Sequence, residues 1–176
     1  MNQISERYAE AVFDLAKEEN KLKEYKEEAK SLGTLITADV IHFFGLKKVS
    51  KEEKKECIKE WFKDYSDTMR HLLCLLVDVN RSAYTTDILK TFISKCNEAL
   101  NIKEVRVYSA RKIEDKNRQE IINAISNKYK SDVELIEYIN PELVAGIKVV
   151  IGGKEIDTTF RKRVDLMKKE LLKEGW

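Results

Sequence analysis

Proline and glycine, the residues that most often turn a polypeptide chain, are concentrated in one segment of this sequence, residues 139–163. The segment contains the only proline and three of the six glycines: Pro141, Gly146, Gly152 and Gly153. Apolar residues at positions 147, 149 and 151 alternate with residues that face the other way, and this twofold period predicts a strand with one apolar face. The pair Gly152–Gly153 predicts a tight turn, because glycine enters left-handed backbone conformations at little cost. A short return strand from Lys154 to Ile156 is expected after the turn.

A helix is expected to follow this hairpin. Asp157 and Thr158 offer side-chain oxygens to the free backbone amides of a helix start. Four apolar residues then recur at spacings of four, three and four, as in one stripe of an amphipathic helix: Phe160, Val164, Met167 and Leu171. The segment therefore predicts a strand, a turn, a strand and a capped helix, and its sequence holds no nucleophile, general base or metal-ligand cluster.

Residues 1–104 contain no proline and little glycine, which favours long helices over a fold with many turns. Apolar residues at helical spacing predict six helices: the first from about residue 4, the second over 22–36, the third over 38–44, the fourth after Ser50, the fifth after Ser66 and the sixth over 85–102. Ser50 and Glu53 form a capping-box pattern, and Gly45 is expected to cap the third helix. The fifth helix is apolar on most sides, so we expect it to be the central one.

The sequence period changes from helical to twofold near Ile102. Val105 and Val107 alternate with polar residues and predict a strand, which is followed by a helical pattern over 115–128 and a second strand over 133–139. We therefore expect a mainly α fold, in which an N-terminal six-helix bundle is followed by a small α+β C-terminal domain. The expected domains are residues 1–104 and 105–176.

The composition fits a helix-rich globular protein. The 176 residues carry 33 basic and 31 acidic side chains, and the formal net charge of +2 does not demand a polyanionic partner. The longest strongly apolar run, residues 72–77, is far shorter than the roughly 20 residues of a membrane-spanning helix. The N-terminal residues lack the basic start and apolar core of a signal peptide, so none is expected. Cys57, Cys74 and Cys96 are widely spaced at apolar helical positions, which favours buried, reduced thiols in a cytosolic compartment.

No motif in the sequence indicates catalysis, a cofactor or a metal. Residues 152–155 lack the first glycine and the hydroxyl residue of a phosphate loop, so a hairpin turn is favoured. His71 and Cys74 share one helix face, but a zinc site requires about two further ligands. The basic residues at 161–163 and 168–169 could contact nucleic acid, yet no aromatic residues are interleaved for base stacking, and a solvated helix face is favoured. A nucleic-acid-binding module and a generic helical protein-interaction module stay open as alternatives.

The C-terminal segment also carries a set of residues that can be compared with known protein families. Its residues are Pro141, Leu143, Val144, Gly146, Ile147, Val149, Ile151, Gly152, Ile156 and Asp157. This pattern resembles the C-terminal signature of the delta subunit of F-type ATP synthase, whose mitochondrial relative is the oligomycin-sensitivity-conferring protein. The departures from the signature are Asn140, Ala145 and the pair Thr158–Thr159. The opening of the first helix, residues 5–16, is also similar to this family.

The resemblance implies a non-catalytic stator subunit without a cofactor. In the family, the delta subunit joins the catalytic head to the peripheral stalk, so that the head does not turn with the rotor during ATP synthesis coupled to protons or sodium ions. The N-terminal bundle would bind an amphipathic segment of an alpha subunit, in a head of alpha and beta subunits. The C-terminal domain would hold the C-terminal ends of b-type stalk helices. The implied location is the cytoplasmic face of the bacterial cell membrane, as a peripheral part of the complex that inserts no segment into the membrane.

The resemblance also implies a groove for the alpha-subunit helix between the first and fifth helices. The residues that would line it are Tyr8, Ala11, Leu15, Leu72 and Leu75. Amphipathic helices bind such grooves through apolar residues on one face, and Ala11 would leave room for a side chain of the partner. The alternative is that these residues fill the core of the bundle. The C-terminal domain is expected to be less ordered without its partner, since about 70 residues rarely supply more than roughly 3–5 kcal/mol of stability.

Overall fold

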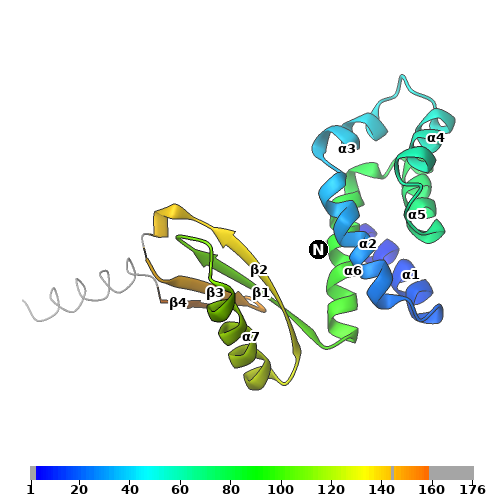
Figure 1. The fold of residues 1–176 in the computed structure, drawn as a ribbon. Coiled ribbons are helices and arrows are strands. Elements are labelled where there is room, and N and C mark those ends of the chain that lie inside the picture. The colour runs from blue at the N-terminus through cyan, green and yellow to red at the C-terminus, as the bar shows by residue number, and fades with distance from the viewer. Residues whose placement is uncertain (1–2, 144, 159–176) are drawn as a thin grey trace, which may run out of the picture. The chain divides into compact units, whose positions relative to one another are not determined.

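The computed structural model of the chain describes residues 3–143 and 145–158. The chain divides into two compact units, residues 1–99 and 100–176. In the described residues the first unit is helical and the second contains a four-stranded sheet (Figure 1), so the predicted mainly α fold with a small α+β part is confirmed. The boundary predicted after residue 104 falls inside the first strand, because the chain already turns at Asn101, which has a φ of 53°.

Helices account for all regular structure described in the first unit. They are α1 (Gln3–Glu18), α2 (Leu22–Leu35), α3 (Ala38–Gly45), α4 (Lys51–Trp61), α5 (Asp67–Asp78) and α6 (Thr85–Ala99), with the short 3-10 helix η1 (Ser82–Tyr84) before α6. Each of the six predicted helices is present, and most of their ends lie within three residues of the predicted positions.

Polar side chains determine several of the helix starts. The capping box predicted before α4 is present: the Ser50 hydroxyl accepts from the Glu53 N–H at 3.2 Å, and the Glu53 carboxylate accepts from the Ser50 N–H at 2.9 Å. Ser66 caps the start of α5 through its side chain. The prediction that Gly45 caps α3 is wrong, because Gly45 is the last helical residue and the chain leaves the helix at Leu46 in an extended conformation.

Asparagine takes the place of glycine after three of the helices. Asn20, Asn80 and Asn101 each lie two residues beyond a helix, and their φ values are between 53° and 57°. Asparagine tolerates this left-handed conformation better than most residues with a side chain. Tight connections after α1, α5 and α6 therefore require no glycine in this chain.

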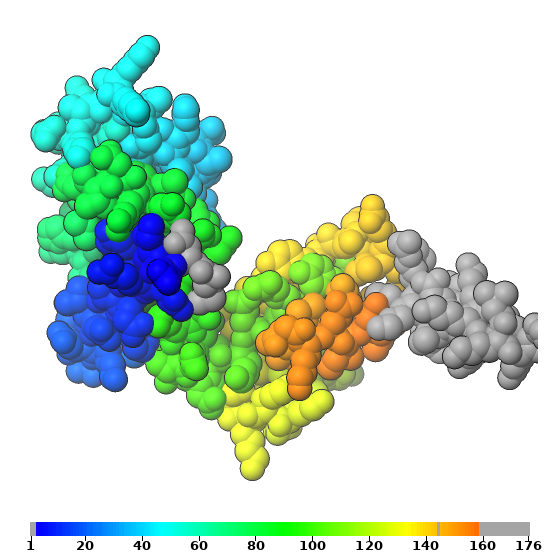
Figure 2. All heavy atoms as spheres, turned by 180° about the vertical axis from the view of Figure 1, so that it is seen from behind, coloured from blue at the N-terminus to red at the C-terminus, as the bar shows by residue number. Residues whose placement is uncertain are grey.

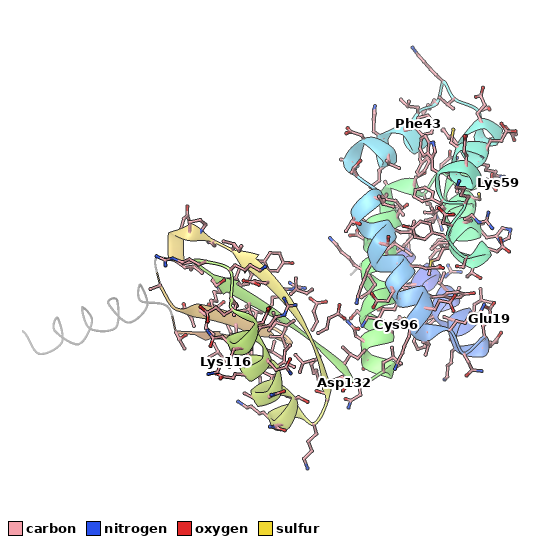
Figure 3. The ribbon with its side chains drawn as sticks, viewed as in Figure 1. Glu19, Phe43, Lys59, Cys96, Lys116 and Asp132 are labelled. Carbon is pink, nitrogen blue, oxygen red and sulfur yellow. The ribbon has the colours of Figure 1, made fainter. Side chains whose placement is uncertain are left out.

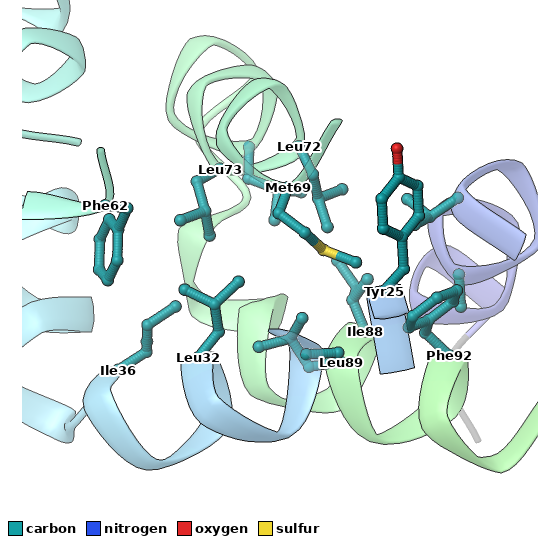
Figure 4. Packing of buried hydrophobic residues seen from close by; sticks show 14 of the residues in the cluster. Tyr25, Leu32, Ile36, Phe62, Met69, Leu72, Leu73, Ile88, Leu89 and Phe92 are labelled. Atoms are coloured by element: carbon teal, nitrogen blue, oxygen red, sulfur yellow. The ribbon is translucent and has the colours of Figure 1, made fainter. Parts of the chain in front are cut away.

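The core of the first unit draws on all six helices. α6 packs along both α1 and α2, whereas α5 packs mainly against α4. Figure 4 shows apolar side chains of α2, α5 and α6 meeting, among them Leu32, Met69 and Leu89, which are almost fully buried. The prediction that α5 is the central helix is therefore wrong. α5 carries more apolar residues than the core accommodates, and Leu75 remains 46% exposed.

The second unit consists of a mixed sheet and one described α-helix. Its elements are β1 (Ile102–Ser109), α7 (Asp115–Tyr129), β2 (Asp132–Ile139), the 3-10 helix η2 (Pro141–Leu143), β3 (Ile147–Ile151) and β4 (Lys154–Asp157). The strand order is β2-β1-β3-β4. β1 and β2 are parallel and are connected through α7, and the other neighbouring strands are antiparallel. The predicted turn is present, since Gly152 and Gly153 have φ values of 53° and 80°.

α7 covers one face of this sheet. Val105 and Val107 of β1 form a buried cluster with Leu135 of β2, Val149 of β3 and Ile125 of α7. Because side chains alternate along a strand, the residues between these point to the opposite face, away from α7. The outer hairpin of β3 and β4, in orange, forms part of the surface of the second unit in Figure 2.

The helix predicted after the hairpin lies outside the described residues, with its apolar stripe Phe160, Val164, Met167 and Leu171. Asp157, which was expected to cap it, is the last residue of β4. The hydroxyl of Thr158 donates to the Ile147 carbonyl at 2.8 Å. The end of β4 is thereby held beside the start of β3.

Candidate docking surface

α1 buries one side and exposes another. The buried side consists of small and medium-sized residues: Ser5, Ala9, Val12 and Ala16. The other side carries the stripe predicted to meet a partner. On that stripe Ala11 is exposed, Leu15 is 45% exposed, and Tyr8 is half-buried against the core. Small buried residues allow α1 to approach α6 closely, and of its larger apolar residues Leu15 is left exposed.

α5 also carries apolar residues on both sides. Its buried residues are Met69, Leu72, Leu73, Leu76 and Val77. Leu75 is 46% exposed, and Val79, directly after the helix, is 41% exposed. Leu72, which was predicted to line the groove, is only 6% exposed and belongs to the core of the bundle (Figure 4). Of the two residues predicted on α5, only Leu75 reaches the surface.

Two sets of side-chain contacts link the ends of α1 and α5 in antiparallel order. Beyond the end of α5, the Arg81 guanidinium donates to the Tyr8 hydroxyl at 3.2 Å and lies 5.8 Å from the centre of the Tyr8 ring. At the opposite end, the Tyr25 hydroxyl lies 3.3 Å from the hydroxyl of Thr68 in the first turn of α5. The same Tyr25 hydroxyl donates to the carboxylate of Glu19, directly after α1. The end of each helix is thus tied to the beginning of the other.

We refer to the exposed and half-buried apolar residues that the two helices carry between these contacts as the α1/α5 surface. It consists of Tyr8, Ala11, Leu15, Leu75 and Val79. Sequence reasoning missed Val79, although it follows Leu75 at the helical spacing of four. It also missed the contact of Arg81 with Tyr8, for which no local pattern gives a signal, because the two residues are far apart in sequence.

Tyr25 is suited to hold this arrangement at neutral pH. The ring is 2% exposed, and burial, followed by the hydrogen bond to the Glu19 carboxylate, raises the pKa of its phenol above the ordinary value. The phenol therefore remains protonated at neutral pH and continues to donate to Glu19.

The described residues contain no candidate metal site. Within residues 3–143 and 145–158, no three His, Cys, Asp or Glu side chains gather where they could hold a metal ion. A surface hollow of about 820 Å³ lies between the end of β1, α7 and the loop at Gly146. Its lining includes both Arg111 and Glu114, which carry opposite charges. The one serine of the lining is Ser109, and its hydroxyl already donates to the Arg111 carbonyl at 2.6 Å. Of the helices that the structure describes, none has both the length and the apolar character to cross a membrane.

The signature residues of the second unit are distributed along its hairpin rather than gathered. Pro141 begins η2, and Gly146 takes a φ of 87° directly before β3. Gly152 occupies the turn, and Asp157 ends β4. Their positions shape the backbone of the hairpin, and the structure does not bring them together as a binding site.

Comparisons with known proteins agree over nearly the whole chain. The family described as ATP synthase delta (OSCP) subunit matches residues 4–171. The chain is 31% identical over 175 residues to the ATP synthase subunit delta of Clostridioides difficile (strain 630), which covers 97% of each chain. It is 31% identical over 172 residues to the protein of that name from Desulforamulus reducens, covering 96% of this chain and 95% of the relative. A chain in the cryo-EM structure of the Toxoplasma gondii mitochondrial ATP synthase hexamer shares the fold, with a TM-score of 0.72 and 19% identity over 96% of this chain and 97% of that one.

Proposed function

The chain belongs to the ATP synthase delta (OSCP) subunit family, and from this premise we propose how it is attached to the rest of the complex. The resemblance seen in the C-terminal signature is confirmed, and the protein is a non-catalytic component of the peripheral stalk. We propose that the α1/α5 surface binds an amphipathic helix from an alpha subunit of the catalytic head. The second unit then holds the C-terminal ends of b-type stalk subunits.

The exposure of apolar side chains on α1 and α5, whose ends are linked in antiparallel order, is the observation that carries this proposal. Leu15 and Leu75 are 45% and 46% exposed, and they belong to helices that bury apolar residues on their other side. Fully burying a leucine side chain contributes about 1.5–3 kcal/mol, so a partner that covers these half-exposed residues gains on the order of 1 kcal/mol from each. A helix with apolar residues at i, i+3, i+4 and i+7 is the partner that fits a strip between two parallel helix axes.

The residues of the α1/α5 surface have different roles in this proposal. Ala11 leaves space for a side chain of the partner helix, and Leu15 and Leu75 supply apolar contacts. Arg81 fixes the Tyr8 ring at the edge of the strip. Leu72 lies beneath the strip and supports it from the core.

The position in the complex follows from the same attachment. The chain lies at the catalytic head, close to alpha and beta subunits, and reaches the bilayer only through its stalk partners. For a bacterial complex, as in the Clostridioides relative, this is the cytoplasmic face of the cell membrane. The proposed contacts involve no ion. This chain therefore does not determine whether protons or sodium ions drive the complex, and that property belongs to other subunits.

Binding of the N-terminal segment of the alpha subunit, measured by calorimetry with the full chain, tests the proposal. We expect Tyr8→Ala and Leu75→Asp each to weaken binding at least fivefold, or about 1 kcal/mol. The melting temperature of Leu75→Asp should change little, because Leu75 is a surface residue, whereas Tyr8→Ala should also lower it, because Tyr8 packs against the core and contacts Arg81.

Leu35→Asp is the matched control, because Leu35 is 51% exposed and lies at the end of α2, outside the α1/α5 surface. It should leave the affinity unchanged. Binding that survives Leu75→Asp, or a melting transition that collapses in that variant, would show that these residues stabilise the bundle and do not bind the partner.

A further inference from the structure

The end of α5 is held from α4 as well as from α1. We propose that Asp78, which two lysines of α4 hold in place, is a positioning residue for the α1/α5 surface, an inference that rests on the proposed function. The two lysines are Lys51 and Lys55. Neither they nor Asp78 belong to the α1/α5 surface. α4 therefore affects how tightly the partner helix binds, although it supplies none of the apolar contacts.

Asp78 occupies an unfavourable place for an acidic residue. It is the last residue of α5, and the last turn of this helix contains no basic residue. The C-terminal carbonyls form the negative end of the helix dipole, so a cation is favoured there and a carboxylate is disfavoured. A residue that opposes the preference of its own helix is expected where a contact with another element compensates for it.

The backbone after α5 folds back onto the helix. The N–H of Arg81 donates to the Leu76 carbonyl at 2.7 Å. The N–H of Asn80, which has a φ of 56°, donates to the Val77 carbonyl at 3.2 Å. These two bonds form a Schellman motif, with asparagine in the position where glycine is most common. The motif itself offers no N–H to the carbonyl of Asp78.

α4 supplies both interactions that the end of α5 needs. The Lys51 ammonium donates to the Asp78 carbonyl at 2.6 Å, and the Lys55 ammonium lies 2.6 Å from the Asp78 carboxylate. The two lysines are at positions i and i+4, so they lie on one face of α4. The hydrogen bond to the Asp78 carboxylate raises the pKa of Lys55, which therefore remains charged at neutral pH.

The same end of α5 carries one edge of the α1/α5 surface. Val79, which is 41% exposed, directly follows Asp78. Arg81 follows two residues later and donates to the Tyr8 hydroxyl at 3.2 Å. A displacement of Asp78 would therefore move Val79 and would pull Arg81 away from the Tyr8 ring. The contacts thus connect α4 to α1 through the end of α5.

The expected effect on binding is modest. The side chains of Lys55 and Asp78 are 32% and 39% exposed, and exposed ion pairs contribute little each. The binding of an apolar helix is nevertheless sensitive to position, because a gap of roughly 0.5–1 Å removes about a quarter to a half of the dispersion attraction at a contact.

A double-mutant cycle tests the positioning role. Binding of the alpha-subunit segment to the full chain is measured by calorimetry, well below the melting temperature. We expect Lys55→Ala and Asp78→Ala each to weaken binding about threefold. The double variant should also lose about threefold, because each residue acts through the other. A loss of roughly ninefold in the double variant would mean that the two residues act independently, and it would overturn the inference.

Glu27→Ala is the matched control. It removes an exposed ion pair of α2, in which the Glu27 carboxylate lies 2.8 Å from the Lys30 ammonium. Glu27 belongs neither to the α1/α5 surface nor to the contacts at the end of α5. This variant should bind the alpha-subunit segment as tightly as the wild type.

The free chain provides a second readout that needs no partner. The Arg81 guanidinium lies 5.8 Å from the centre of the Tyr8 ring, so the ring current shifts the NMR signals of the Arg81 side chain. We expect this shift to decrease in Lys55→Ala and in Asp78→Ala. If these residues only stabilised the fold, the melting temperature would fall while the Arg81 shift and the affinity of the folded chain stayed the same.

The outcomes separate this inference from the proposed function. If the wild-type chain binds the alpha-subunit segment and both single variants bind equally tightly, Asp78 is not a positioning residue, although the proposed attachment stands. If the wild-type chain does not bind the segment, the proposed attachment fails and this inference fails with it.

Discussion

Cys96 illustrates how burial controls the chemistry of a side chain. It lies on α6 (Figure 3) and is 0% exposed. Burial raises the pKa of its thiol to about 11. Burial also raises the pKa of Cys74, which is half-buried like Cys57, and all three cysteines are free. Because the thiolate is the reactive form, Cys96 is inert at neutral pH while the chain is folded.

This burial makes stability depend on pH in the alkaline range. An unfolded thiol ionises near pH 8.5, whereas the folded thiol ionises near its pKa of about 11. Between these pH values the native state binds more protons than the unfolded state. The contribution of the buried thiol to stability is therefore fully present below the unfolded pKa and is lost as the pH rises toward the folded pKa. Relative to Cys96→Ala, the wild type should lose up to about 1.4 kcal/mol of unfolding free energy per pH unit in this window.

Urea unfolding of both proteins at several pH values measures the difference. The comparison with Cys96→Ala removes the contributions of tyrosines and lysines, which titrate in both proteins. A difference in unfolding free energy that stays constant from pH 8 to about pH 10.5 would contradict the prediction.

Individual elements depend on a few local interactions, and the start of α4 is the clearest case. The Glu53 carboxylate accepts hydrogen bonds from the N–H and the hydroxyl of Ser50, at 2.9 and 2.8 Å. The bond from the backbone N–H, followed by that from the hydroxyl, lowers the pKa of Glu53. A carboxylate with a lowered pKa stabilises the fold above its unfolded pKa, and this contribution is lost as pH falls through the folded value.

Ser50→Ala should lower the unfolding free energy by about 1 kcal/mol at pH 7, because α4 loses the acceptor for the Glu53 N–H. The effect should decline in acid, where Glu53 becomes protonated in both proteins and the capping box is weakened. Thermal unfolding of the wild type and the variant at pH 7 and at acid pH measures the loss of unfolding free energy and its decline. Ser50→Thr keeps a hydroxyl acceptor and should behave nearly as the wild type, so an equal loss in that variant would show that the cap is not the cause.

The elements also show what the sequence could predict. Capping residues and apolar periodicity are local, and for this reason the helices and the hairpin were predicted close to their observed bounds. The packing of those elements is not local. Leu72 and Leu75 belong to the same apolar run, but only the packing of α5 within the bundle decides that Leu72 is buried and Leu75 is exposed. The tie from Arg81 to Tyr8 could not be predicted for the same reason.

At the scale of the whole molecule, the two units differ in how much apolar surface they bury. The first unit has a core to which all six of its helices contribute, with Leu32, Phe92 and Leu89 almost fully buried. Among the residues that the structure describes, the second unit has a much smaller cluster, centred on Val105 and Val107. Free energy from apolar burial scales with area, so the second unit has less stability of its own.

Hydrogen exchange on the isolated chain should therefore show faster exchange through global opening in β1, β2 and α7 than in α2 and α6. A domain of fewer than about 80 residues rarely gains more than roughly 3–5 kcal/mol from a single core, and exchange of its most protected amides reports that value.

Adding the stalk subunit should slow exchange in the second unit alone, because a partner that binds only the folded form stabilises that unit by mass action. Adding the alpha-subunit segment should slow exchange in α1 and α5 and leave the sheet unchanged. Equal protection of both units in the isolated chain would mean that the small sheet is stabilised by something other than its partner, and the division into a stable head-binding unit and a partner-dependent stalk-binding unit would have to be abandoned.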